Sequence, residues 1–352
     1  MALSGRNDRG VERSGKGGAC YVIAEAGVNH NGDIGVAREL VKAAAESNAD
    51  AIKVQTFIAE DVTAPTARKA VYQLETTSKK ESQLEMLRSL ELPREAHAEL
   101  QELCRDLGVA FVSTPFDTKS VDLLDELGVP FIKIGSGEVT NLPFLEYVAR
   151  KGRPIVLSTG MSTLAEVDEA VCAIERAGCT DLTLLHCVSN YPADPAAVNL
   201  RAMETMHQAW GHPVGYSDHT PGIAVAVAAA ALGACVIEKH FTLDRALPGP
   251  DHRASLEPGV FREMVDAIRT VERAMGDGRK APAASEIETA AAARRSLVAA
   301  RDIAPGETLR EEDVAILRPG TGLPPSMLRY VLGCTTRTAI KAGALLELEM
   351  LA

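Results

Sequence analysis

The sequence lacks the features that mark membrane-spanning, secreted and nucleic-acid-binding proteins. No stretch approaches the run of about 18 apolar residues that crosses a bilayer, and the most apolar one, Ile223 to Val236, is Ala-rich and interrupted by Gly233. No tract rich in Lys and Arg offsets the net charge of −11, which argues against a nucleic acid partner. The seven cysteines form no Cys-x-x-Cys pair and the N-terminus has no apolar signal core, so we expect a reducing cytoplasm.

The composition is that of a globular protein. With 352 residues, 46% of them hydrophobic, the chain can bury a sizeable core and form one large domain plus a small one. Residues 1–18 are polar, rich in Gly, Arg and Ser and without periodicity, so we expect a disordered extension there. If the ligand is anionic, an acidic protein must gather cations, amide dipoles or a metal at one local site.

Eight short apolar runs recur after the extension, each followed by a longer amphipathic segment. Strands that alternate with helices pair in parallel through right-handed crossovers, so eight such units predict an α/β fold closed into a (β/α)8 TIM barrel over residues 19–278. An open, doubly wound sheet is the alternative. The runs are Tyr21–Ala26, Ala51–Thr56, Ala110–Thr114, Phe131–Gly135, Ile155–Thr159, Leu182–Cys187, Val214–Ser217 and Val236–Phe241.

The pattern changes after the eighth unit. Residues 279–293 read as a polar, Ala- and Pro-containing linker that ends in a short helical segment. Residues 294–352 predict a compact, mostly β module whose short strands are broken by Pro and Gly. Two similar six-residue segments, 302–307 and 339–344, indicate an internal pseudo-repeat.

Polar side chains collect at the C-terminal ends of the predicted strands, where barrels place their active sites. A single buried lysine could be a core ion pair, but two lysines with several hydroxyls and glycines describe a pocket for a phosphate plus a carboxylate. His219 and His240, from neighbouring strand ends, are candidate ligands of a divalent metal with open positions, or else hydrogen-bonded core histidines. His30, His186 and His252 fit a core role better. Glu25 and Glu138 are candidate general acid/base groups, or side chains that orient Lys or His.

These residues stand within motifs that resemble the sialic acid synthase family, in order from about residue 20 to the C-terminus. The likeness favours bacterial members that make N-acetylneuraminic or legionaminic acid over the pseudaminic acid and spore-coat relatives. The tail LRPGTG at 317–322 resembles the antifreeze-like (SAF) domain of that family. The barrel motifs are AEAGVNH at 24–30, KVQTF at 53–57, STPF at 113–116, KIGSGE at 133–138, LSTGM at 157–161, LHC at 185–187, YSDHT at 216–220, EKHF at 238–241 and GPDH at 249–252.

The resemblance implies a reaction, its cofactor and a role for each residue. Phosphoenolpyruvate would condense with an open-chain N-acyl mannosamine-type sugar to give a nine-carbon 2-keto acid and phosphate. Manganese, or else magnesium or cobalt, would be bound by His219 and His240, while Glu25 and Glu138 would move protons at the aldehyde and at water. The implied phosphoenolpyruvate-binding residues are Lys53, Thr114, Lys133, Ser136, Ser158, Ser189 and Ser217, and the implied sugar-binding residues are Gln55, Tyr191, Asp251 and Arg318.

Arg318 lies outside the barrel sequence, in the small C-terminal module. In the family the corresponding arginine reaches the N-acyl group in the partner subunit's active site, so the resemblance implies a domain-swapped homodimer.

Two other functions stay open at this point. A metal-dependent aldolase, or another phosphoenolpyruvate-condensing synthase acting on a different aldehyde, would use the same barrel and metal. A catalytically silent carbohydrate- or ice-binding protein would fit the antifreeze-like tail but leave the Lys, Ser, His and Glu set unexplained.

Overall fold

The computed structural model describes residues 19–78 and 80–352. They fall into two units, the first ending at Gly276 and the second spanning Asp277–Ala352. The disordered extension expected at residues 1–18 lies outside the described residues. No helix within the described part of the chain combines the length and apolar character needed to cross a membrane.

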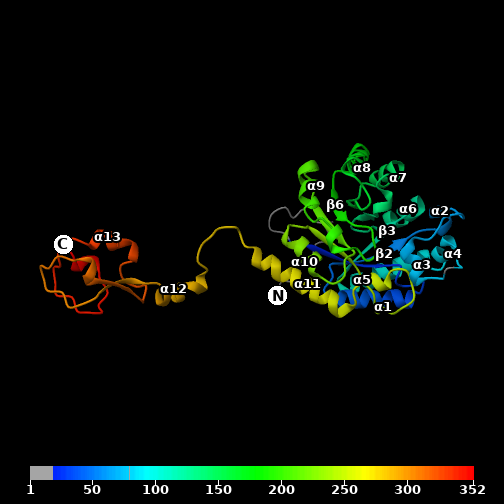
Figure 1. Ribbon diagram of the computed structural model, residues 1–352. Coiled ribbons are helices and arrows are strands. Elements are labelled where there is room, and N and C mark those ends of the chain that lie inside the picture. The colour runs from blue at the N-terminus through cyan, green and yellow to red at the C-terminus, as the bar shows by residue number, and fades with distance from the viewer. Residues whose placement is uncertain (1–18, 79) are drawn as a thin grey trace. The chain divides into compact units, whose positions relative to one another are not determined.

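The first unit is a nearly closed barrel of eight parallel strands (Figure 1). The order β3-β2-β1-β8-β7-β6-β5-β4 follows the chain around the barrel, and β3 packs against β4 where the order begins and ends. This arrangement confirms the predicted TIM barrel and excludes the doubly wound sheet. The strands are β1 (Tyr21–Gly27), β2 (Ala51–Thr56), β3 (Ala110–Pro115), β4 (Ile132–Ile134), β5 (Ile155–Ser158), β6 (Leu182–Cys187), β7 (Val214–Asp218) and β8 (Val236–His240).

Amphipathic helices cover the outside of the strands. In α8 the buried residues Val167, Ala170, Val171 and Ile174 recur at helical spacing and form one apolar face, and the Thr163 hydroxyl caps the first turn by accepting from the Glu166 amide. The covering helices are α1 (Ile34–Glu46), α5 (Arg94–Leu107), α6 (Thr118–Leu127), α7 (Leu142–Ala149), α8 (Leu164–Arg176), α9 (Ala202–Trp210), α10 (Ala224–Ala231) and α11 (Pro258–Met275).

The barrel interior is layered. An apolar cluster that takes residues from six of the strands occupies the level nearest their N-terminal ends, with Ile23 and Phe131 among its members. Because side chains alternate along a strand, the inward position two residues further on is polar: Glu25 follows Ile23, and Lys133 follows Phe131. Charged groups therefore rest on an apolar floor and face the C-terminal mouth of the barrel.

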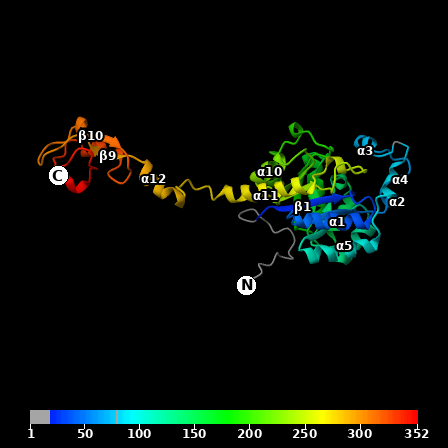
Figure 2. The same cartoon turned by 90° about the horizontal axis from the view of Figure 1, so that it is seen from below.

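The connection between β2 and β3 is longer than a simple crossover and carries short extra helices, which the sequence pattern does not indicate. Figures 1 and 2 both place them together at one side of the barrel. Beneath them, Phe57, Met86 and Leu90 form a small cluster with Val28. The helices are α2 (Ala59–Val62), α3 (Val71–Thr76) and α4 (Gln83–Arg88).

The second unit carries α12 (Ile287–Ala293), the antiparallel pair β9 (Ser296–Ala299) and β10 (Val314–Leu317), and α13 (Leu328–Val331). Ile303 and Ile340, which occupy equivalent positions in the two similar segments, pair with each other through two backbone hydrogen bonds of 2.8 and 2.9 Å. Both side chains are buried in the core of this unit. The repeat thus brings its two copies together as neighbouring segments.

Candidate active site

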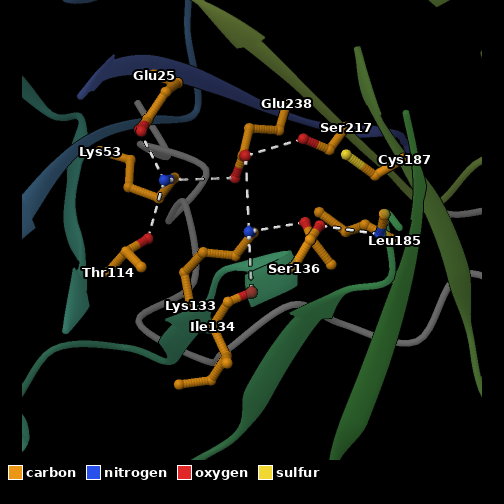
Figure 3. Close-up of polar contacts among 12 residues, drawn as sticks. Glu25, Lys53, Thr114, Lys133, Ile134, Ser136, Leu185, Cys187, Ser217 and Glu238 are labelled. Atoms are coloured by element: carbon orange, nitrogen blue, oxygen red, sulfur yellow. Dashed lines mark hydrogen bonds and ion pairs between the residues drawn. The ribbon is translucent and has the colours of Figure 1, made fainter. Parts of the chain in front are cut away.

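Two buried lysines and two buried glutamates form a network inside the barrel (Figure 3). The Lys53 ammonium lies 2.7 Å from Glu25 Oε2 and 3.8 Å from Glu238 Oε2, while the Lys133 ammonium lies 3.6 Å from Glu238 Oε1. Hydroxyls complete the network, because Lys53 donates to Thr114 Oγ1 at 2.9 Å and Lys133 donates to Ser158 Oγ at 2.8 Å. Both ammonium groups are therefore fixed in place before any anion arrives.

Burial and mutual attraction set the charges of this network. Burial alone would lower the pKa of Lys53, but Glu238 and Glu25 raise it above the ordinary value. Burial alone would raise the pKa of Glu238, but Lys133 and Lys53 lower it. Burial raises the pKa of Glu25 to about 7, against the opposing pull of Lys53. Burial lowers the pKa of Lys133, against the opposing pull of Glu238. The cluster gains one positive charge when Glu25 takes up a proton near neutral pH.

Ser217, Ser136 and Ser189 extend the hydroxyl set. Ser217 Oγ donates to Glu238 Oε1 at 3.1 Å, and Ser136 Oγ accepts from the Gly160 amide at 2.9 Å. A Cβ at Gly160 would lie 2.2 Å from Ser189 Oγ and 2.9 Å from Ser136 Oγ, so the two serines converge on a backbone that only glycine allows. All seven residues expected to bind phosphoenolpyruvate thus line one region at the C-terminal ends of β2 to β7.

His219 and His240 meet beside this region. Their ring centroids are 5.2 Å apart, and the Tyr191 ring lies 4.2 Å from His219. His219 Nδ1 is 2.7 Å from the Val188 carbonyl oxygen, which in the neutral ring fixes the tautomer that leaves Nε2 with a lone pair. Burial lowers the pKa of His219, but Cys187 and the Val188 carbonyl raise it above the ordinary value. Burial holds the pKa of His240 well below its ordinary value, so its imidazole is neutral.

The two imidazoles fit a divalent metal ion. His240 Nδ1 is buried and finds no hydrogen-bond partner within the described residues, and the nearest carboxylate oxygen, Asp251 Oδ2, is 4.0 Å away. Neutral imidazole nitrogen is a common ligand of such ions. Residues 19–78 and 80–352 contain no group of three or more His, Cys, Asp or Glu arranged to hold a metal. Water and substrate oxygens would have to supply the other ligands, as an open catalytic site requires.

Glu25, Gln55 and Asp251 converge around Gly27, at the mouth of the barrel. A Cβ at Gly27 would lie 3.2 Å from Glu25 Oε1, 3.5 Å from Gln55 Nε2 and 3.5 Å from Asp251 Oδ2. Burial raises the pKa of Asp251 to about 6. Three of the residues expected to act on the sugar therefore face one small space next to the histidines.

A pocket of about 300 Å³ adjoins this space. Most of its lining residues, among them Tyr191, Thr220, Arg253 and Ala254, come from the loops after β6, β7 and β8, and Thr76 at the end of α3 also lines it. Thr220 Oγ1 is buried and has no hydrogen-bond partner in the described part of the chain. The pocket thus has a mixed apolar and polar wall, and the Thr220 side chain beside it is fully enclosed.

Two expected site residues are not joined to this cluster. Glu138 is half-buried in the single turn Ser136–Glu138 and accepts from Asn141 Nδ2 at 2.7 Å, away from the lysine network. Arg318 belongs to the second unit, where its Nε donates to the Ala293 carbonyl oxygen at 3.0 Å. Their roles remain predictions.

Comparisons with known proteins agree with this geometry. The NeuB family model matches residues 40–280, more than half of the chain, and the SAF domain model matches residues 294–352. The chain belongs to the NeuB family.

Relatives of the chain within the NeuB family carry specific names. The N,N'-diacetyllegionaminic acid synthase of Legionella pneumophila is 46% identical over 350 residues, 98% of each chain. That of Campylobacter jejuni is 49% identical over 311 residues, 88% of this chain and 92% of the relative. The N-acetylneuraminic acid synthetase structure from Leptospira borgpetersenii has a TM-score of 0.68 at 33% identity and covers 77% of this chain and 90% of that one.

The sequence interpretation missed some residues that organise this NeuB-family site. Glu238 bridges both lysines, and its signal was present in the period-two spacing with His240. Gly160 carries no local signal, because its importance comes from Ser136 in the turn after β4 and Ser189 in the loop after β6. The remaining histidines are hydrogen-bonded, as expected for a core role. His30 and His252 are also buried, and His186 Nε2 is 2.6 Å from the Val198 carbonyl oxygen.

Proposed function

We propose that this chain condenses phosphoenolpyruvate with an open-chain N-acyl mannosamine-type sugar. C3 of the enol attacks the aldehyde carbon, water adds at C2, and phosphate leaves, giving a nine-carbon 2-keto acid. One observation carries the proposal. The buried ammonium groups of Lys53 and Lys133 each donate to a hydroxyl and share the carboxylate of Glu238, and the imidazoles of His219 and His240 lie beside them.

Phosphoenolpyruvate carries a phosphate and a carboxylate on three carbons, and the lysine network supplies matching charges. Lys53 and Lys133 attract the two anionic groups, while Ser136, Ser189 and the Gly160 backbone surround a space suited to phosphate oxygens. Glu238 keeps the ammonium groups apart and oriented in the absence of substrate. Preformed charges of this kind act on the transition state without reorganising during the reaction.

His219 and His240 hold the divalent ion in this proposal. Such an ion, manganese here with magnesium and cobalt as alternatives, supplies Lewis-acid polarisation of the sugar aldehyde when it is bound. Glu25 lies next to Gln55 and Asp251 and holds a proton near neutral pH, so it donates to the aldehyde oxygen. Glu138 accepts the proton of the water that adds at C2.

The sugar occupies the space around Gly27 and extends into the adjoining pocket. Gln55, Tyr191 and Asp251 contact its hydroxyls, and the pocket receives the substituents further from the aldehyde. Two relatives at 46% and 49% identity are named N,N'-diacetyllegionaminic acid synthases. We therefore infer that the acceptor is 2,4-diacetamido-2,4,6-trideoxymannose, with N-acetylmannosamine and its 6-phosphate as the alternatives.

The second unit completes the site in a homodimer. Arg318 of one chain reaches the N-acyl group bound in the partner's barrel, and the SAF domain is exchanged between chains. The reaction takes place in the cytoplasm, where phosphoenolpyruvate is available and where free cysteines, as all seven are here, stay reduced.

Phosphate release tests the proposal directly. Chelator-stripped protein receives phosphoenolpyruvate and Mn²⁺ with each of the three sugars in parallel. We expect metal-dependent release with the diacetamido sugar and at most slow release with the others. Formation of the keto acid from pyruvate and the sugar, with no phosphate released, would point to an aldolase. Tight sugar binding with no release in a folded, metal-loaded protein would point to a binding protein.

A further inference from the structure

A second buried ion pair lies directly behind the two histidines. Lys239 Nζ is 2.7 Å from Asp218 Oδ2, and both side chains are 0% exposed. In the parallel register of β7 and β8, Asp218 stands opposite Lys239, just as Ser217 stands opposite Glu238. Because side chains alternate along a strand, Asp218 and Lys239 point outward when Ser217 and Glu238 point into the barrel.

On the outward side, α10 packs against both strands and α9 packs against β7. The sequence of α10, AVAVAAAA, contains no polar side chain and offers the ammonium group no side-chain hydrogen bond. The pair instead bonds to Thr220 in the loop that follows β7.

The pair holds the backbone of Thr220 from both sides. Asp218 Oδ1 accepts from the Thr220 amide at 2.8 Å, and Lys239 Nζ donates to the Thr220 carbonyl oxygen. His219 lies between Asp218 and Thr220, and His240 directly follows Lys239. One ion pair therefore fixes the chain on both sides of the first imidazole and immediately before the second.

Stability alone gives little reason to keep such a pair. Replacing a buried ion pair by neutral side chains of similar volume is often neutral or stabilising, whereas removing only one partner is strongly destabilising. An apolar pair would suit the alanine layer of α10 but could not hold the amide and the carbonyl of Thr220.

We propose that Asp218 and Lys239 are positioning residues that hold His219 and His240 at the separation needed to bind one divalent ion. The inference rests on the metal site of the proposed function. Groups that orient metal ligands commonly change metal affinity by about 10–100-fold when they are lost. The pair touches neither the lysine network nor the phosphate-side serines, so phosphoenolpyruvate binding does not depend on it.

The proposal is tested by titrating purified full-length protein with Mn²⁺ and measuring the affinity by calorimetry. In the double variant Asp218→Asn/Lys239→Met no uncompensated charge is left buried, and we expect it to fold and to bind Mn²⁺ about 30-fold more weakly, with an unchanged KM for phosphoenolpyruvate. Lys239→Arg can still donate to both acceptors, so we expect an affinity within about threefold of the wild type.

Arg269→Met is the matched control, because Arg269 pairs with Asp50 at 2.7 Å near the N-terminal ends of β1 and β2, far along the strands from the histidines. It should lower the melting temperature and leave Mn²⁺ affinity unchanged. Wild-type affinity in a folded double variant, or an equal loss in the control, would overturn the positioning role. Wild-type protein that binds no Mn²⁺ would overturn it as well. If the wild type releases no phosphate but the double variant still binds Mn²⁺ more weakly, the proposed reaction is refuted and the positioning role of Asp218 and Lys239 is supported.

Discussion

The proposed phosphoenolpyruvate side and the proposed sugar side of the site are built differently. On the first side, Lys53 and Lys133 each donate to a hydroxyl and each pair with Glu238, whose Oε2 makes no hydrogen bond among the described residues. On the second side, His240 Nδ1 and Thr220 Oγ1 are buried without hydrogen-bond partners among the described residues, next to a pocket of about 300 Å³. In the proposed function, the barrel prepares the anion site from its own strands, and ligands and the second unit of a partner chain complete the sugar side.

Gly160→Ala should break the phosphoenolpyruvate side with the largest effect. The new Cβ would lie 2.2 Å from Ser189 Oγ, so the serines must move out of the space suited to phosphate. Forced overpacking costs about 1–3 kcal/mol, which is about 5- to 150-fold if it falls on substrate binding. Because two serines must move, we expect a rise near the upper end, about 100-fold, in the KM for phosphoenolpyruvate. Steady-state kinetics should show little change in the sugar KM. Gly137→Ala is the control, since a Cβ there meets nothing within 4 Å, and an equal effect from it would contradict the assignment.

Gly27→Ala should break the sugar side instead. The new Cβ enters the space between Glu25, Gln55 and Asp251, and the φ of +53° adds strain of about 1 kcal/mol. We expect the sugar kcat/KM to fall about 30-fold, the KM for phosphoenolpyruvate to stay within about twofold, and the melting temperature to drop by a few degrees. If both glycine variants impaired both substrates equally, the division into two sides would not hold.

Gly160 and Gly27 illustrate which features of the fold and of the site can be predicted from the sequence and which cannot. The strand–helix alternation predicted the barrel because the pattern is local, and the C-terminal strand ends predicted the lysines and histidines because all strands of a barrel end at one mouth. Gly160 and Ser189 approach each other from the loops after β5 and β6. The bonds of Asp218 and Lys239 to the Thr220 backbone connect β7 with β8. Such pairings depend on register and loop path, which no single segment encodes. The helices between β2 and β3 were missed because α2 to α4 are too short for periodicity.

The pH dependence of the sugar kcat/KM should reveal the protonation of Glu25 and so sharpen the comparison of the two sides. Burial raises the pKa of Glu25 to about 7, and proton donation to the aldehyde needs the protonated form, so the sugar kcat/KM should fall about tenfold from pH 6 to pH 8. Glu25→Gln should remove this dependence, while Asp251→Asn should keep it. Because the folded-state pKa lies above the ordinary 4.5, the stability that Glu25 contributes is fully present below pH 4.5 and is lost as pH rises through about 7. A flat wild-type rate profile would refute the assignment.

Arg318→Ala should give the smallest effect and the sharpest test of the exchanged SAF domain. Loss of one hydrogen bond to an N-acyl group costs about 1 kcal/mol, so we expect the sugar KM to rise about fivefold and the KM for phosphoenolpyruvate to stay unchanged. Mixing this variant at high concentration with inactive His240→Ala distinguishes the two arrangements. If Arg318 acts in the partner's barrel, half of the sites in each mixed dimer combine an intact barrel with an intact arginine and recover the wild-type sugar KM. If Arg318 acts within its own chain, no mixed dimer gains such a site, and the sugar KM of the mixture stays at the value of Arg318→Ala alone.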